Sequence, residues 1–320
     1  MRPSGAEFDE ILLLDQGEVE ATLAEASLLD VMRVALTRYT EGVASAPPRV
    51  AVASQMGWLA AMPGYIPDLA LATKLISVFP ENAALGRPSH QGIVALFDEV
   101  DGRLLCLMDA RSITARRTAA VSVLSITALA RPGWSVVALL GSGTQAVAHL
   151  DALKELAEPS EIRISARRSA SARELAARDP RCRSVSTFRE AVTDAEVVIC
   201  CTDSEAPVVE RGWLKSGCHV VSVGSGQELD GATVNDSSVF VEWRGAATNR
   251  PPAGARELQD LAPAGLTELG EVLIDPRRGR RNGEEITVFK STGLAVEDAA
   301  AARLVYEAAL SRGTGRKLPW

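Results

Sequence analysis

A glycine loop between a predicted strand and a predicted helix is the first feature of the sequence that could do chemistry. The apolar run 136–140 predicts a buried strand, and helix-spaced apolar residues follow from Ala146 onward. Gly141 permits the tight turn, and Gly143 lets the backbone approach a ligand. Because free N–H groups at a helix start attract anions, the segment predicts a site for the pyrophosphate of a dinucleotide. The predicted contacts are Gly141, Ser142, Gly143, Thr144 and Gln145.

A lysine in an otherwise apolar stretch is the second such feature. Residues 69–76 read Leu-Ala-Leu-Ala-Thr-Lys-Leu-Ile, which predicts a strand that contains Lys74. Burying an ammonium group costs free energy unless the group is paired or functional. A partly desolvated lysine has a lowered pKa and can exchange protons near neutral pH. Lys74 is therefore a candidate acid–base group, and the alternative is an edge-strand lysine that points to water.

Composition excludes several classes of protein. The 320 residues are 47% hydrophobic and 23% charged, which is typical of a globular protein large enough for two domains. The net charge of −7, without a basic stripe, argues against nucleic acid as a partner. No apolar run approaches the ~20 residues of a membrane span. Five cysteines without CxxC spacing indicate buried thiols in a reducing cytoplasm, and three histidines argue against a metal site.

The elements that position these residues fall into two regions. In the first region, the segment 11–39 predicts one or two helices. Segment 112–129 predicts a long helix, capped by Ser112 or Thr114, that leads into the strand before the glycine loop. Between these helices, short runs of strand pattern predict a mostly antiparallel or mixed sheet. These runs are 49–54, 57–62, 70–77, 91–98 and 104–109.

From residue 136 onward, strands and helices alternate with the βαβ rhythm of a doubly wound parallel sheet. A strongly amphipathic helix is predicted over 296–311. The predicted fold class is therefore α/β, with a doubly wound dinucleotide domain over 119–295. Residues 1–118 and 296–320 form an α+β domain that the C-terminal helix closes. The strands predicted in the second region are 136–140, 161–165, 197–201, 219–224, 238–242 and 286–289, and the helices are 146–156, 170–178 and 266–273.

Seven motifs follow one another over nearly the whole chain. They are Ala72-Thr73-Lys74, Phe79-Pro80-Glu81-Asn82, Gly86-Arg87-Pro88-Ser89, Thr114-Ala115-Arg116-Arg117-Thr118-Ala119-Ala120, Gly141-Ser142-Gly143-Thr144-Gln145-Ala146, Glu228-Leu229-Asp230 and Lys290-Ser291-Thr292-Gly293-Leu294-Ala295-Val296-Glu297-Asp298. In their order and spacing, these motifs resemble the ornithine cyclodeaminase/μ-crystallin family. The resemblance implies a homodimer, formed through the sheet of the substrate domain, and a Rossmann domain that binds NAD(H) or NADP(H). The family includes cyclodeaminases, amino acid dehydrogenases, cyclic imine reductases and a crystallin that binds thyroid hormone.

The resemblance also implies roles for individual residues. Arg49 and Arg117 stand where the family has arginines that grip the substrate carboxylate in two-point geometry. Lys74 stands where a catalytic lysine exchanges a proton with the substrate nitrogen. Ser89 stands where many members have a threonine, whose hydroxyl would contact cofactor or substrate. The alternatives are solvated surface charges for the arginines and a turn residue for the serine.

The end of the second strand of the dinucleotide domain bears on the choice of cofactor. A carboxylate at this position binds the ribose 2′-hydroxyl of NAD, whereas arginine or serine suits the 2′-phosphate of NADP. This chain has arginines there and no acid, which predicts NADP(H) in preference to NAD(H). The predicted contacts are Ala166, Arg167 and Arg168, followed by Thr202, Val223 and Ser291 nearer the nicotinamide.

One departure from the family pattern bears on the reaction. Cyclodeaminases carry a catalytic aspartate after Gly-Ala, but the loop 223–230 is shorter here and has no aspartate after Gly224. Glu228 and Asp230 match only the generic end of that motif. The sequence thus predicts an NAD(P)H-dependent oxidoreductase for the C–N bond of a small α-imino or α-amino acid. The alternatives are an ornithine cyclodeaminase-type lyase that recycles NAD, and a non-catalytic, crystallin-type NADP-binding protein.

Overall fold

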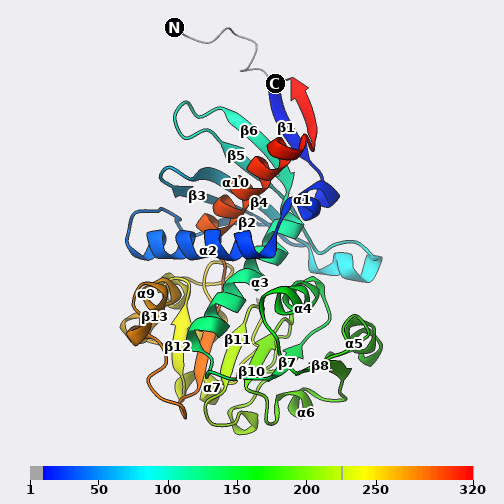
Figure 1. Cartoon of the computed structure of the whole chain (residues 1–320), viewed down its shortest axis with the longest axis vertical. Helices are drawn as coiled ribbons and strands as arrows, with labels where there is room; N and C mark the ends of the chain where they lie inside the picture. The colour runs from blue at the N-terminus through cyan, green and yellow to red at the C-terminus, as the bar shows by residue number, and fades with distance from the viewer. Residues whose placement is uncertain (1–9, 225, 320) are drawn as a thin grey trace. The chain divides into compact units, whose positions relative to one another are not determined.

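The computed structural model describes residues 10–224 and 226–319. The chain divides into two compact units, whose helices and strands are labelled in Figure 1. Unit 1 comprises Met1–Arg117 and Leu294–Trp320, and unit 2 comprises Thr118–Gly293. The two ends of the chain therefore belong to one unit, and a single continuous segment forms the other.

Unit 1 contains a mixed sheet of seven strands among the described residues, in the order β15-β1-β6-β5-β4-β3-β2. Lys74 lies in the middle of β4, where the register places Met62 of β3 on one side and Val94 of β5 on the other. It is buried in an interior strand, so the alternative of a solvated edge-strand lysine is wrong. The strands are β1 (Glu10–Leu14), β2 (Val50–Ala53), β3 (Trp58–Ile66), β4 (Ala70–Val78), β5 (His90–Phe97), β6 (Leu104–Asp109) and β15 (Arg316–Pro319).

Helix α10 (Ala295–Arg312) packs on β3, β4 and β5 and runs beside α2 (Glu25–Thr40) (Figure 1). Its start lies so close to the sheet that a Cβ on Gly64 would stand 2.6 Å from the carbonyl oxygen of Ala295. The predicted closing helix is confirmed. Its predicted amphipathic character is wrong for the first half, because residues 295–302 are all buried. The shorter helices of unit 1 are α1 (Gln16–Thr22) and η1 (Pro80–Leu85).

Two local predictions in unit 1 are wrong. The segment predicted as helical from Ile11 begins with strand β1, which pairs in parallel with β6 and antiparallel with β15. A short apolar run does not distinguish a strand from a helix by periodicity, and the partner strands are far away in the sequence. Helix α3 (Ala110–Leu129) begins before Ser112 and Thr114, so neither residue is its N-cap.

Unit 2 contains an eight-stranded sheet among the described residues, in the order β13-β12-β14-β11-β10-β7-β8-β9, and every pairing in it is parallel. The predicted doubly wound fold class is confirmed. Strand order reverses between β7 and β10, which is the switch point where such sheets bind ligands. The strands are β7 (Val136–Leu140), β8 (Glu161–Ser165), β9 (Cys182–Ser184), β10 (Val197–Cys200), β11 (His219–Ser222), β12 (Ser238–Val241), β13 (Thr267–Glu268) and β14 (Thr287–Lys290).

Short helices connect these strands. Two short elements, β9 and α6, were not predicted from the sequence, and the segment 266–273, predicted as a helix, contains β13 before its helix begins at Leu269. The helices are α4 (Thr144–Leu156), α5 (Ser169–Ala176), α6 (Phe188–Val192), α7 (Gly231–Asn235), α8 (Gly245–Thr248) and α9 (Leu269–Ile274), with 3₁₀ turns η2 (Arg211–Trp213), η3 (Arg256–Leu258), η4 (Pro263–Gly265) and η5 (Pro276–Arg278). Within the described part of the chain, no helix is long and apolar enough to cross a bilayer.

Candidate active site

Four buried charged side chains in unit 1, which we call the lysine centre, surround the middle of β4. They are Lys74, Arg117, Glu297 and Asp298. Lys74 Nζ lies 2.7 Å from Asp298 Oδ2. Arg117 bridges both acids, with Nη1 2.6 Å from Glu297 Oε2 and Nε 3.2 Å from Asp298 Oδ1. Two cations and two carboxylates make the lysine centre formally neutral, which is how buried charges are tolerated.

The surroundings of Lys74 adjust its acidity. The pKa of Lys74 is lowered from 10.5 to about 8, mainly by burial and also by the positive charges of Arg117 and Arg49, while Asp298 opposes the shift. Burial acts to raise the pKa of Asp298, but the charges of Lys74 and Arg117 hold it below its ordinary value. Lys74 can therefore change protonation state near neutral pH while its partner stays ionised.

The structure brings Arg49 to the lysine centre. Its neighbour Val50 pairs with Ala61, so Arg49 stands at the register position beside Met62, which in turn pairs with Lys74. Thr114, on α3, lies on another side of the lysine, with Oγ1 3.5 Å from Nζ. Two predicted substrate residues, Arg49 and Arg117, thus meet the predicted acid–base group.

Ser89 is not brought to the lysine centre. It lies just before β5, where its carbonyl accepts a hydrogen bond from Phe79 and its hydroxyl contacts the His90 ring. This end of the sheet is four residues along β4 from Lys74, a separation of roughly 13 Å in a strand. The predicted substrate contact of Ser89 stays a prediction.

Glu297 and Asp298 belong to the site although the sequence did not predict a role for them. Both acids stand in the first turn of α10, where acids favour the helix dipole and therefore attract no notice. Their exposed fractions of 0% and 1% show a different role, because buried carboxylates need cationic partners. The sequence feature that could have indicated their role is a pair of adjacent acids at the start of an alanine-rich helix.

The glycine loop of unit 2 follows β7 at the switch point. Gly141 has φ +115°, and a Cβ there would lie 2.4 Å from the carbonyl oxygen of Cys201, so only glycine fits. A Cβ on Gly143 would meet no atom within 4 Å. Gly143 is the N-cap of α4, and no side chain caps that helix. The loop thus holds an open space in front of a helix N-terminus, which fits the pyrophosphate of a dinucleotide.

The two glycines are expected to respond differently to alanine. Gly141→Ala will lower stability by more than about 1 kcal/mol because the left-handed backbone and the Cys201 carbonyl both exclude a Cβ. Gly143→Ala will leave the melting temperature nearly unchanged, but its Cβ will enter the space proposed for the pyrophosphate and weaken NADPH binding roughly tenfold or more, about the worth of one charged hydrogen bond. Thermal denaturation without cofactor and calorimetric titration with NADPH measure the two effects. Equal effects of both substitutions on cofactor affinity and on stability would contradict this division of roles.

Other predicted dinucleotide contacts lie along the same part of unit 2. Ser142 and Gln145 are half-buried, Thr144 is exposed, and the buried Gln145 Oε1 has no hydrogen-bond partner among the described residues. Ala166 is half-buried directly after β8, and Arg167 and Arg168 are exposed beyond it. These positions surround the loop at the carboxyl ends of β7 and β8.

Thr202, Val223 and Ser291 follow β10, β11 and β14, at the carboxyl edge of the sheet. The Ser291 hydroxyl donates to Glu242 Oε1 at 2.6 Å, and the Thr202 hydroxyl donates to Glu228 Oε1 at 2.8 Å. Both hydroxyl protons are therefore committed to buried carboxylates. The predicted cofactor contacts of these residues stay predictions.

The shortened loop 223–230 offers no carboxylate in place of the family's aspartate. Glu228 is completely buried and accepts hydrogen bonds on both oxygens. Asp230 caps α7 by accepting from the Thr233 N–H. Ser225 lies outside the described residues. Both acids of the loop are thus engaged in hydrogen bonds within unit 2.

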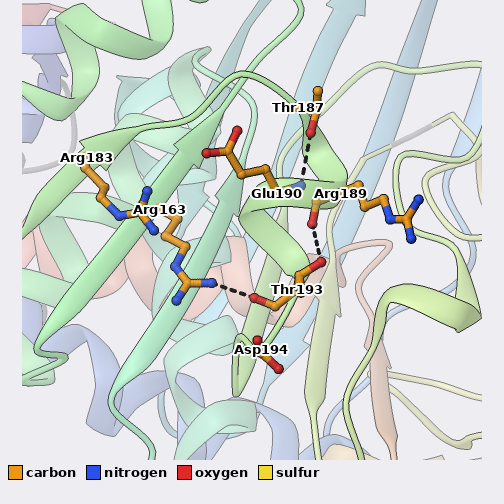
Figure 2. Close-up of a pocket in the computed structure, with 7 residues that line it drawn as sticks. All are labelled: Arg163, Arg183, Thr187, Arg189, Glu190, Thr193 and Asp194. Carbon is orange, nitrogen blue, oxygen red and sulfur yellow. Dashed lines mark hydrogen bonds between the residues drawn. The ribbon is translucent and has the colours of Figure 1, made fainter.

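A surface pocket in unit 2 lies elsewhere on the sheet (Figure 2). Its volume is about 420 Å³, and it is lined by Arg163, Arg183, Thr187, Arg189, Glu190, Thr193 and Asp194. Arg163 Nη1 donates to the Thr193 carbonyl at 2.5 Å, and Asp194 precedes β10. The pocket therefore includes the amino edge of the sheet, whereas the glycine loop lies at the carboxyl edge. Among the described residues no group of three potential metal ligands occurs, either here or in the lysine centre.

Known proteins resemble the chain over nearly its whole length. The model of the ornithine cyclodeaminase/mu-crystallin family matches residues 9–313. The ketimine reductase mu-crystallin of Mus musculus is 36% identical over 309 residues, which cover 92% of this chain and 96% of that protein. Delta(1)-pyrroline-2-carboxylate reductase of Thermococcus litoralis, solved with NADH and L-proline, has a TM-score of 0.90 at 31% identity, with 96% and 99% of the two chains covered. An archaeal alanine dehydrogenase dimer with bound NAD has a TM-score of 0.85 at 30% identity, with 97% and 99% covered.

Proposed function

Because the chain belongs to the ornithine cyclodeaminase/mu-crystallin family, we propose that it is an NAD(P)H-dependent oxidoreductase that acts on the C–N bond of an α-imino or α-amino acid. The lysine centre carries this proposal, because a buried lysine with a pKa of about 8 lies beside arginines suited to a carboxylate. The related proteins named as ketimine reductase and pyrroline-2-carboxylate reductase support an imine as the oxidised substrate.

In the proposed reaction, Lys74 moves the proton and the arginines hold the substrate. The Lys74 ammonium donates to the substrate nitrogen when C=N becomes C–N, and the neutral amine accepts that proton in the reverse direction. Asp298 fixes the lysine at 2.7 Å and thereby acts as a positioning residue. Arg49 and Arg117 bind the carboxylate next to the reacting carbon. When bound, the nicotinamide supplies or accepts the hydride.

The pH dependence of the reaction follows from the acidity of Lys74. Its pKa is lowered to about 8, so the protonated donor predominates below about pH 8 and is lost above it. The kcat/KM for imine reduction is expected to be flat below this pH and to fall about tenfold per pH unit above it. For amino acid oxidation, kcat/KM should instead rise with pH up to about 8, because neutral Lys74 is then required as the proton acceptor. Initial rates across pH 6–10 in both directions measure this dependence. If both reactions lost or both gained rate as the pH rises through 8, Lys74 would not be the group that transfers the proton.

The proposed cofactor is NADP(H) in preference to NAD(H). Arg167 and Arg168 are exposed and form no ion pair with any residue that the structure describes. Two guanidinium groups after the second strand suit a 2′-phosphate, and no carboxylate stands there for a ribose hydroxyl.

We propose a homodimer that covers the open face of the unit 1 sheet. Successive side chains of a strand point to opposite faces, so Leu75 lies on the face opposite Lys74. Leu59, Leu75 and Ile93 are 49%, 37% and 40% exposed on that face, and neighbouring Val52 is 64% exposed. Such a contiguous apolar surface favours association. Ile93→Glu is expected to halve the mass measured by light scattering, and an unchanged mass would contradict this interface.

A cytoplasmic location is proposed from the cysteines. All five thiols are free, and Cys106, Cys200, Cys201 and Cys218 are buried. Free thiols are characteristic of reducing compartments.

The proposed function is tested by following reduced-nicotinamide absorbance. Purified protein is mixed with NADPH or NADH and either a cyclic imine carboxylate or a mixture of 2-oxo acid and amine. Absorbance loss that requires the imine, and that is faster with NADPH, supports the proposal. Ammonia release from ornithine without net cofactor change would establish the lyase instead. Tight cofactor binding without either reaction would indicate a binding protein.

A further inference from the structure

Three buried charged side chains in unit 2 form a group that we call the carboxyl-edge cluster. Its members are Glu228, Glu257 and Lys290, whose side chains are at most 2% exposed. None of them takes part in the proposed proton transfer. Burying three ionisable groups together is costly, so their arrangement calls for a physical explanation.

Glu228 joins the ends of two neighbouring strands. Its Oε1 accepts from the Thr202 N–H at 2.6 Å and the Thr202 hydroxyl at 2.8 Å. Its Oε2 accepts from the Ser222 hydroxyl at 2.7 Å and the Gly224 N–H at 2.8 Å. Each oxygen faces a backbone N–H, which can only donate, so the arrangement suits an ionised carboxylate.

Glu257 and Lys290 complete the cluster. Glu257 Oε1 accepts from the Leu229 N–H at 2.9 Å and also from the Glu228 N–H, and its Oε2 lies 2.7 Å from Lys290 Nζ. Lys290 Nζ also donates to Ser222 Oγ at 2.9 Å and to the Gly224 carbonyl at 2.8 Å. These three acceptors use all three protons of an ammonium group.

The cluster carries a formal charge of −1, because two carboxylates face one ammonium. No other charged side chain in the described part of the chain pairs with Glu228, Glu257 or Lys290. The lysine centre, by contrast, balances two cations against two carboxylates. The carboxyl-edge cluster thus keeps one negative charge inside a region of low dielectric, where Coulomb interactions reach further than in water.

The cluster lies where the dinucleotide is proposed to bind. Thr202 directly follows Cys201, whose carbonyl lies against Gly141 of the glycine loop. Ser222 ends β11, the next strand of the sheet beyond β10. Glu228 is therefore hydrogen-bonded to Thr202 at the carboxyl end of β10, and Thr202 is the residue next to the Cys201 carbonyl that lies against Gly141.

We infer that the carboxyl-edge cluster favours binding of the oxidised over the reduced cofactor through its uncompensated negative charge. The inference rests on the proposed function, since it requires a nicotinamide cofactor at this edge. The oxidised ring carries a positive charge that the reduced ring lacks, so a fixed negative charge attracts only the oxidised form. The cluster therefore assists hydride donation to the substrate by stabilising the cofactor form that donation leaves behind.

A series of variants that changes the charge of the cluster tests this inference. Glu257→Gln and Glu228→Gln bring the charge to zero, and Lys290→Met brings it to −2. The dissociation constants of NADP⁺ and NADPH are measured by calorimetry for each protein. We expect the ratio of the NADP⁺ constant to the NADPH constant to rise roughly tenfold in both glutamine variants and to fall in Lys290→Met, because each substitution changes the charge of the cluster by one unit. The ratio of the two dissociation constants should therefore follow the charge of the cluster, and the two glutamine variants should give similar ratios.

Glu196→Gln is the matched control. Glu196 is a hydrogen-bonded carboxylate at the opposite, amino edge of the sheet, where it accepts from the Ser135 and Val136 N–H groups. Its substitution should leave the ratio unchanged. Equal weakening of both cofactor forms in the three cluster variants would overturn the inference and show that the cluster only positions the loop. Glu257→Gln keeps the side-chain shape, so it decides the question if the other two variants do not fold. Failure of the wild-type protein to bind either form would instead overturn the proposed function.

Discussion

Lys74→Met is expected to lower kcat/KM for imine reduction by about 10²–10⁴-fold, the usual contribution of a positioned acid or base. Methionine fills a similar volume in the interior of the sheet but has no proton to transfer. The structure places Lys74 Nζ 2.7 Å from Asp298 Oδ2 and 3.5 Å from Thr114 Oγ1, so the substitution removes the ammonium group that these neighbours hold in place. The residual rate should also lose the limb near pH 8, because the titrating group is gone.

The loss must be separated from damage to the fold and to cofactor binding. Leu75→Met introduces the same side chain at the next residue of β4, on the opposite face of the sheet, and should retain activity. NADPH affinity should be unchanged in both variants because neither substitution alters the glycine loop of unit 2. A Lys74→Met protein that keeps more than about a tenth of the wild-type rate would exclude acid–base catalysis by this lysine.

The fold was largely predictable where local pattern is decisive. The apolar runs 136–140 and 161–165 and the glycine loop between a strand and a helix led directly to the parallel sheet of unit 2. The failures involve partners distant in the sequence. Strand β1 depends on β6 and on β15, at the other end of the chain, and no local signal distinguishes its apolar residues from the start of a helix.

The candidate sites show the same limit. Lys74 was predictable because burying a lysine in an apolar strand costs free energy, so a lysine there indicates a buried partner or a function. Lys290 ends a similar apolar run, so the cost of burial could have singled it out in the same way. The predicted strand ended at Phe289, however, and did not include Lys290. Glu257 and Asp298 gave no comparable signal, because only the tertiary fold buries them and supplies their cations.

Arg117→Met is expected to destabilise the protein by about 3–5 kcal/mol, the usual cost of removing one partner from a buried ion pair. Arg117 is 4% exposed and contacts both Glu297 and Asp298. Without it, the lysine centre keeps two carboxylates and one cation, Lys74, and therefore has a formal charge of −1. The melting temperature should fall by roughly 4–8 °C, taking about 1.5 °C per kcal/mol for a chain of 320 residues.

A second substitution separates charge from packing in this effect. Glu297→Gln in the Arg117→Met background removes the carboxylate that lies 2.6 Å from Arg117 and restores a neutral centre of Lys74 and Asp298. We expect the double variant to melt above Arg117→Met although it lacks one more native charge, since the uncompensated carboxylate causes most of the loss. It should remain inactive, because Arg117 is proposed to hold the substrate carboxylate. A double variant that melts below Arg117→Met would mean that guanidinium packing, rather than charge balance, stabilises this part of unit 1.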